Sequence, residues 1–433
     1  MFSGNMILRN IFTVVVVLGG IASAINPNDL LLTGSASYEF GQIVKGQGIQ
    51  QVREDYDKVL DHTWLQQAIG QLGADVRLAP GLEMKLGFEF AMVFSYISSS
   101  NVLWKSTLFP GSRFYPTQLQ GIYTLGDLQG NRWSQFAVGY FPFKYNPDVR
   151  NLGEYLFRTG TYPGYIMNDF DFPAQRLLGF RISGGFSAGK FKGAGDFLLT
   201  SETLFYPLQD FSPSLIVKAS FSDAVEIGGG VSFNRLWSVN ENYTIYKKAP
   251  YVDSLGDTTY FTSAGTKLMA RIMLDPKMLF VSPASSPFGT NDLRVYAEIA
   301  VLGLKDYPRY YTEVNKRRPV VFGFNVPTFK VLDLLSVEWE WYGNDYPNSY
   351  ENIYMYLQPY PTQPMTAFDS KDDDIKWSVY LKRSFFNGRF SVTGQVARDH
   401  IRLVSFQDDL AFMQEAITKK DHWHWTIKTR FGF

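Results

Sequence analysis

Apolar and polar residues alternate strictly along much of this chain. In the segment 82–96, every second residue from Leu82 to Tyr96 is apolar or aromatic, and the residues between them include Glu83, Lys85 and Glu89. Successive side chains of a β-strand point to opposite faces, so this pattern gives a strand one apolar face and one polar face. A helix would instead scatter the three charges around its axis. The segment is therefore predicted to be a strand.

The same alternation recurs often enough to predict an all-β fold. We expect about 16 strands, with the approximate spans 32–44, 67–78, 82–96, 117–126, 133–143, 176–186, 190–201, 213–221, 225–235, 258–274, 291–303, 318–326, 333–343, 374–385, 390–400 and 421–433. The segment Phe136–Phe143 is apolar at both parities, so its pattern does not determine which face is which.

The connections between these strands alternate between long and short. The long ones are 45–66, 97–116, 144–175, 202–212, 236–257, 304–317, 344–373 and 401–420, and the short ones are 79–81, 127–132, 187–189, 222–224, 327–332 and 386–389. One connection, 275–290, is long where a short one is due, and it contains Pro276, Pro283 and Pro287. Alternating long loops and short turns with an even strand number are typical of transmembrane barrels, which close on themselves and leave no edge strand.

Composition narrows the class of protein. The chain has no cysteine, which excludes disulfides, thiolate metal sites and cysteine nucleophiles. Its 41 basic and 41 acidic residues argue against a nucleic-acid partner, because such proteins usually carry a basic excess. The aromatic fraction of 16% suits a barrel that shows lipid one face and water the other.

The first 24 residues have the pattern of a secretory signal. Arg9 precedes an apolar core at Ile11–Ile21, and Ala22-Ser23-Ala24 offers small residues at a cleavage site. The apolar run is shorter than the roughly 20 residues that a membrane helix needs. We therefore predict that 1–24 is a cleaved signal peptide and that 25–433 is a single barrel domain. The first strand begins soon after Ala24, which leaves no room for an N-terminal plug.

The last strand carries the most specific pattern. Trp423, Trp425, Ile427, Phe431 and Phe433 share one parity, and the chain stops at Phe433. A final amphipathic strand that ends in Phe resembles the assembly signal of Gram-negative outer-membrane β-barrels, and the whole mature chain resembles the porins among them in architecture. The resemblance implies a transmembrane antiparallel barrel of about 16 strands (14 to 18) in the bacterial outer membrane. It also implies that Phe433 serves assembly, and that lipid, the barrel-assembly machinery, small hydrophilic solutes and other copies in a homotrimer are partners.

The polar parity of the predicted strands carries many charges. A basic residue on the lipid face near the midplane would cost about 2–4 kcal/mol, so these charges are expected to face the lumen. As pore-lining residues we predict Arg77, Glu83, Lys85, Glu89, Lys267, Arg271, Arg294, Glu298, Glu338, Glu340 and Lys376. Sixteen strands make a barrel wide enough for an aqueous channel. The alternative is that the charges pair with one another along the wall and only stiffen it.

The third long connection, 144–175, is the candidate constriction. In porins the corresponding loop often folds inward, and the resemblance implies the same here. Its candidate residues are Arg150, Glu154, Tyr155, Arg158, Asp169 and Asp171. Together with Lys144, Asp148 and Arg176 the segment has balanced charge, which predicts weak ion selectivity. Its aromatic residues, Tyr145, Tyr155, Phe157, Tyr162, Tyr165, Phe170 and Phe172, offer flat surfaces to sugars. An ordinary outer loop that packs on the rim remains the alternative.

No pattern for catalysis, a metal or a cofactor stands out. His422 and His424 share one strand face, and His400 could lie near them, so a metal site is conceivable, but rim positions explain these histidines better. Gly184-Gly185-Phe186-Ser187-Ala188-Gly189 lacks the lysine and the helix of a phosphate loop. We therefore expect no enzyme activity, no metal and no cofactor.

The leading hypothesis is a porin that lets small hydrophilic solutes, and saccharides among them, diffuse through a lumen narrowed by 144–175. A structural or adhesive barrel that binds an extracellular polymer through its long loops is the second hypothesis. A transporter of hydrophobic substrates is a third, and the lack of room for a plug disfavours it. A soluble β-sandwich or propeller would explain the alternation but not the loop pattern, and no propeller repeat is visible.

Overall fold

The computed structural model describes residues 29–48, 58–93, 111–128, 130–150, 152–157, 175–201, 210–237, 249–261, 264–280, 286–306, 313–341, 374–403, 414–415, 417 and 419–433. The predicted signal peptide, residues 1–24, lies outside these ranges, so its cleavage stays a prediction. None of the helices in these ranges is long and apolar enough to cross a membrane.

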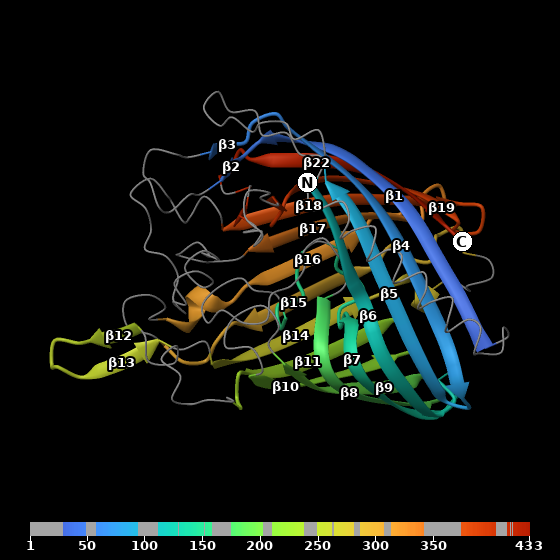
Figure 1. Cartoon of the computed structure of the whole chain (residues 1–433), viewed down its shortest axis with the longest axis horizontal. Helices are drawn as coiled ribbons and strands as arrows, with labels where there is room; N and C mark the ends of the chain where they lie inside the picture. The colour runs from blue at the N-terminus through green and yellow to red at the C-terminus, as the bar shows by residue number, and fades with distance from the viewer. Residues whose placement is uncertain are drawn as a thin grey trace, which may run out of the picture.

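Sixteen strands form one closed barrel (Figure 1). They are β1 (Leu30–Lys45), β4 (Thr63–Ala79), β5 (Leu82–Val93), β6 (Gly111–Gly126), β7 (Arg132–Phe143), β8 (Gln175–Ala188), β9 (Phe191–Ser201), β10 (Phe211–Phe221), β11 (Val225–Asn234), β14 (Gly265–Leu274), β15 (Val295–Val301), β16 (Val320–Asn325), β17 (Leu334–Trp341), β18 (Ile375–Phe385), β19 (Phe390–Arg398) and β22 (Trp423–Gly432). Each strand pairs antiparallel with the next barrel strand along the chain. The predicted fold class and strand number are confirmed.

The barrel closes between its first and last strands. β22 pairs with β1 in a register that sets Phe431 opposite Ala36. Phe433 extends this pairing, because its N–H donates to the Gly34 carbonyl at 3.0 Å and its own carbonyl accepts from Gly34 N–H at 3.2 Å. The Phe433 ring lies where a Cβ at residue 34 would be, 2.2 Å from that position. Only glycine fits this place without a shift.

Short turns gather at one end of the barrel, which we call the turn end, and long connections gather at the other, the loop end. Three small sheets lie outside the barrel: β2 (Gln47–Gly48) with β3 (Lys58–Val59), β12 (Ala249–Val252) with β13 (Thr258–Phe261), and β20 (Arg402–Leu403) with β21 (Gln414–Glu415). The β12–β13 hairpin projects from the loop end, and Phe433 lies toward the opposite end (Figure 1).

Two predicted strands were wrong in extent. β6 begins at Gly111, six residues before the predicted start at 117. The span 258–274 was predicted as a single strand, but its first part is β13, which pairs with β12, and only Gly265–Leu274 joins the barrel. Period-2 alternation is the same in a projecting hairpin and in a barrel wall, so the pattern does not separate them. The irregular connection 275–290 begins with the short helix α2 (Lys277–Phe280), and the 3-10 helix η4 (Val314–Arg317) precedes β16.

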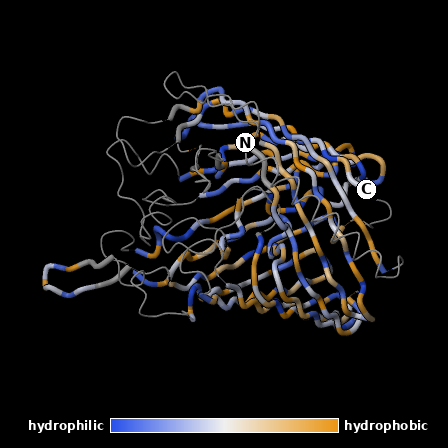
Figure 2. Tube along the Cα trace, viewed as in Figure 1, coloured by the Kyte–Doolittle hydropathy of each residue, from blue (hydrophilic) through white to orange (hydrophobic). Residues whose placement is uncertain are grey.

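Hydrophobic and hydrophilic residues alternate along the barrel strands (Figure 2). Many of the apolar side chains are exposed on the outer surface. Leu72, Val138 and Val217 are about half exposed there. Phe136 is also exposed on this face, whereas Phe141 and Phe143 of the same strand are buried inside the barrel. β7 is therefore apolar at both parities because it contacts the surroundings on one face and an internal apolar cluster on the other.

Candidate functional site

Three buried glutamates mark the inner wall at β15 and β17. Glu298, Glu338 and Glu340 each have a relative exposure of 1% or less. Val337 and Trp339, their neighbours in sequence, are exposed on the outer surface, so the glutamates point into the barrel.

The described part of the connection after β7, residues 144–150 and 152–157, crosses the lumen to these glutamates. Glu298 accepts hydrogen bonds from Tyr145 Oη at 2.6 Å and from Asn146 Nδ2 at 2.6 Å. It also accepts the backbone N–H groups of Glu154 at 3.3 Å and Tyr155 at 3.0 Å. One carboxylate therefore gathers four donors from the loop.

The two glutamates of β17 hold the neighbouring residues of the loop. Glu338 accepts the backbone N–H groups of Arg150 at 2.5 Å and Leu152 at 3.3 Å. Glu340 accepts Gly153 N–H at 3.1 Å and Tyr155 Oη at 2.7 Å. Hydrogen bonds to an ionised acceptor are stronger than neutral ones, so these contacts fasten the loop across the barrel.

A tight bend in the loop directs its amides toward this wall. Gly153 and Glu154 both have positive φ, +78° and +61°. Successive residues of this conformation turn neighbouring N–H groups toward one concave side, which favours anionic acceptors. A Cβ at residue 153 would approach Val321 to 3.1 Å, so glycine also permits the close approach to β16.

The other side of the loop is apolar and fills part of the lumen. Leu152, Tyr155, Leu156 and Phe157 are buried at 1% exposure or less. They belong to one cluster with inward side chains of the wall: Phe141, Phe143, Leu177, Leu198, Ile216, Met269, Met273, Tyr296, Ala300, Leu302 and Val321. The rings of Phe143 and Phe157 meet edge-to-face with centroids 5.7 Å apart. These side chains pack much of the lumen on the side toward β7–β17, which we call the filled half.

The structure places three of the six predicted constriction residues. Arg150, Glu154 and Tyr155 lie in the inward loop, whereas Arg158, Asp169 and Asp171 lie outside the described residues. The proposed sugar-facing role of Tyr145, Tyr155 and Phe157 was wrong, because all three are buried at 5% exposure or less. Their apolar surface stabilises the loop instead of meeting solutes.

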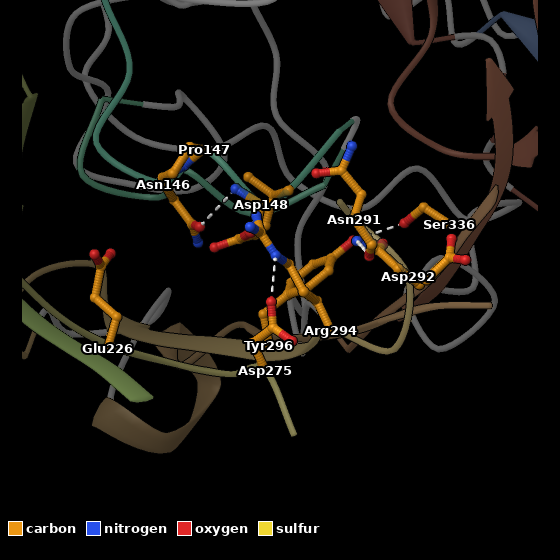
Figure 3. Close-up of polar contacts among 12 residues, drawn as sticks. Asn146, Pro147, Asp148, Glu226, Asp275, Asn291, Asp292, Arg294, Tyr296 and Ser336 are labelled. Atoms are coloured by element: carbon orange, nitrogen blue, oxygen red, sulfur yellow. Dashed lines mark hydrogen bonds and ion pairs between the residues drawn. The ribbon is translucent and has the colours of Figure 1, made fainter. Parts of the chain in front are cut away.

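Arg294 ties the loop to the turn end (Figure 3). Its Nη1 lies 3.3 Å from Asp148 of the loop, and its Nε lies 3.2 Å from Asp275. Asp275 is also 2.6 Å from Lys277 Nζ. A cavity of about 950 Å³ opens beside this chain of charges, between the loop and the segments 275–278 and 286–294. The described parts of the irregular connection, 275–280 and 286–290, therefore border the lumen from the turn end.

Four other predicted pore-lining residues point inward but are buried against protein groups. Glu89 accepts a hydrogen bond from Gln71 at 2.7 Å and another from the Tyr115 hydroxyl. Lys267 donates to the Tyr155 carbonyl at 3.3 Å, and Arg271 pairs with Glu226. Lys376 donates to the Ile417 carbonyl at 2.6 Å.

The remaining predicted residues, Arg77, Glu83 and Lys85, line a second cavity of about 1080 Å³. This cavity lies on the inner faces of β4–β8 near the turn end. We call this side of the lumen the open half. Lys85 is 3.0 Å from Asp75, and both side chains are partly exposed. Gln118, Gln120, Gln135 and Arg181 also line it, and none of the four is among the predicted pore-lining residues. The prediction relied on charge, so it did not reach the three glutamines.

Two histidines form contacts that the sequence did not suggest. His400 Nε2 is 2.6 Å from Glu340, the carboxylate that holds Gly153, and His424 Nε2 is 2.9 Å from Asp399. Within the described part of the chain, no group of His, Cys, Asp and Glu has the arrangement of a metal site.

Solved porin structures are similar to this chain in architecture. A variant of the Rh. blastica porin shares 8% identity at a TM-score of 0.40, with 93% of this chain and 100% of that chain covered. Salmonella typhi OmpF in complex with daunomycin shares 9% identity at a TM-score of 0.47, with 94% and 99% covered. Pseudomonas putida OprB shares 10% identity at a TM-score of 0.29, with 96% of each chain covered. At these values the likeness concerns the barrel alone. No protein-family model matches the chain, and no curated protein matches it in sequence.

Proposed function

We propose that the protein is an outer-membrane channel for passive diffusion of small hydrophilic solutes. The observation that carries this proposal is a closed barrel of 16 strands with apolar side chains outside, an inward-fastened loop and polar cavities inside. An exposed apolar belt of this kind costs free energy in water and is stabilised in lipid. A closed barrel meets the need of lipid-exposed backbone for internal hydrogen bonds.

The loop 144–157 narrows the path to the open half of the lumen. Its contacts with Glu298, Glu338 and Glu340 support a fixed constriction, because they span the wall from β15 to β17. We further propose that neutral polar solutes, including saccharides, pass along the open half. The support is the amide-rich lining of Gln118, Gln120 and Gln135, which donates and accepts hydrogen bonds without net charge.

Planar-bilayer conductance tests the channel and the loop together. The purified barrel is expected to give discrete conductance steps with weak ion selectivity. Deleting about Leu152 to Asp169 is expected to raise the single-channel conductance. No steps from folded protein would contradict the channel, and unchanged conductance of a folded deletion variant would contradict the constriction.

Membrane location and processing are tested separately. Cell fractionation is expected to place the protein in the outer membrane, and N-terminal sequencing of that material is expected to read Ile-Asn-Pro, after cleavage behind Ala24. An N-terminus at Met1 in the same fraction would contradict the signal peptide. Cross-linking in native membranes would report a homotrimer.

A surface barrel that binds an extracellular polymer is the second candidate. The β12–β13 hairpin projects from the loop end, and Leu255 at its tip is 86% exposed. Asp253 Oδ1 accepts the N–H groups of Leu255 at 2.8 Å and Asp257 at 2.9 Å, which orders this tip. Removing the tip is expected to leave conductance unchanged, and loss of cell adhesion in that variant would favour the second candidate.

A further inference from the structure

The open half of the lumen contains an arginine without a carboxylate partner. Arg181 of β8 is half-buried, and no Asp or Glu lies within ion-pair distance of it among the residues the structure describes. Asp196 influences Arg181 electrostatically without forming an ion pair with it, and its carboxylate accepts a hydrogen bond from Ser183 at 2.5 Å. A partly desolvated cation that lacks a counter-ion carries an unfavourable desolvation cost.

The surroundings of Arg181 hold its guanidinium in place beside the cavity. Its Nη2 donates to Gln135 Oε1 at 2.7 Å, and Gln135 Nε2 donates to Thr124 at 3.2 Å. The guanidinium also lies over the Phe141 ring, 5.6 Å from the centroid. Arg181 thus stands at the border between the filled half and the cavity of about 1080 Å³. Its Nε is buried without a hydrogen-bond partner in the described structure.

Gln120 has, beside the same cavity, a second polar atom that lacks a hydrogen-bond partner among the described residues. Its side chain lines the cavity although the residue is only 8% exposed. Its Oε1 is buried and has no hydrogen-bond partner in the described part of the chain. Gln120 lies opposite Lys85 in the β5–β6 register, and among the described residues Lys85 Nζ pairs with Asp75 through one of its three donors. Donors therefore face the cavity from Lys85 of β5 and Arg181 of β8, and Gln120 of β6 adds an acceptor.

We propose that this cavity is a binding subsite for small hydroxylated carboxylate solutes, with Arg181 and Lys85 holding the carboxylate and Gln120 accepting a hydrogen bond from a solute hydroxyl. The planar fork of a guanidinium matches a carboxylate, and the immobilised position of Arg181 reduces the entropy lost on binding. Gln118 and Gln120 add amide groups that bind hydroxyls of the same solute. The preferred solutes are hydroxylated carboxylates, such as sugar acids. The inference rests on the proposed channel, because the subsite lies inside the lumen.

Binding is measured first in a way that needs no conduction. Isothermal titration calorimetry with the folded barrel in detergent and low-chloride buffer uses gluconate as the probe and glucose as the neutral control. Gluconate is expected to bind saturably and glucose far more weakly. Arg181→Gln is expected to weaken gluconate binding about tenfold, as for loss of a charge-assisted hydrogen bond. Arg132→Gln, on an exposed arginine of neighbouring β7, is expected to leave it unchanged.

Heat-modifiable gel mobility confirms that each variant is folded. If Arg181→Gln does not fold, Gln120→Leu provides the test, with a several-fold weaker affinity expected. Absence of saturable gluconate binding to the unaltered barrel, equal binding of glucose, or equal binding by the Arg181 and Arg132 variants would overturn the subsite. Bilayer conductance of the same samples reports the channel independently, so failure of the channel and failure of the subsite are distinguishable.

Discussion

The two halves of the lumen use the same kind of residue for different purposes. In the filled half, Glu298, Glu338 and Glu340 are buried at 1% exposure or less and accept hydrogen bonds from the inward loop. In the open half, Glu83 and Lys85 line a cavity and remain partly exposed. All five are charged residues on the inward parity of barrel strands. An inward-pointing charged side chain therefore does not always contact solute. It contacts solute only where no loop residues pack over it.

The largest effect is expected from Glu298→Gln. The amide has one oxygen for four loop donors, and its own N–H groups face them, so the loop loses several charge-assisted hydrogen bonds. We expect the free energy of unfolding to fall by about 2–4 kcal/mol. Urea titration in detergent measures the loss, and limited proteolysis reports release of the loop.

Glu83→Gln is the matched control in the open half, because Glu83 lines the cavity and forms no hydrogen bond with the described part of the loop. A change of less than about 0.5 kcal/mol is expected for this surface-like position. Equal destabilisation by the two variants would refute the distinction between the halves.

The pairing of β1 with β22, which closes the barrel, is expected to show the next largest effect on stability. Deleting Phe433 removes the two backbone hydrogen bonds to Gly34 and the ring that covers it. We expect a loss of about 1–3 kcal/mol and a lower yield of folded barrel in the membrane. Phe386→Ala is the control, since Phe386 is 78% exposed in a turn at the same end and Phe433 is 80% exposed. Normal folded yield with altered conductance would assign Phe433 to transport instead of assembly.

Tyr155→Phe tests a single contact of the filled half. The variant loses the hydroxyl bond to Glu340 but keeps the buried ring, so about 1 kcal/mol of stability is expected to be lost. The melting temperature by circular dichroism measures this, and Tyr123→Phe on the outer face is the comparison. An unchanged melting temperature would mean that Gly153 N–H and His400 satisfy Glu340 without the hydroxyl.

Glu83→Lys is expected to have the smallest effect on stability and a visible effect on permeation. The free energy of unfolding should stay within about 0.5 kcal/mol. The reversal potential in a salt gradient should move toward anion selectivity, because replacing a carboxylate by an ammonium group changes the net charge of the cavity lining by +2. An unchanged reversal potential would place the ion path away from β5.

The sequence by itself determined the wall of this barrel. Alternation placed all 16 strands, and the parity of segments such as Leu82–Val93 correctly separated the outer face from the inner one. It also predicted a barrel that closes on itself, and in the structure β22 pairs with β1 to close it. These features are local, because a two-residue period and a turn depend only on neighbouring residues.

The tertiary structure alone decided which inward charges are covered and which line a cavity. Asn146 and Glu298 are 152 positions apart in the chain, yet they meet at 2.6 Å. Glu338 and Glu340 place two negative charges on the same face of one strand, which indicates that hydrogen-bond donors must approach this face. The sequence does not indicate which segment supplies those donors. Arg181 and Gln120 line the cavity that remains on one side of the lumen, because the loop fills the other side. Such contacts depend on the path of a loop across the barrel, and strand periodicity carries no information about that path.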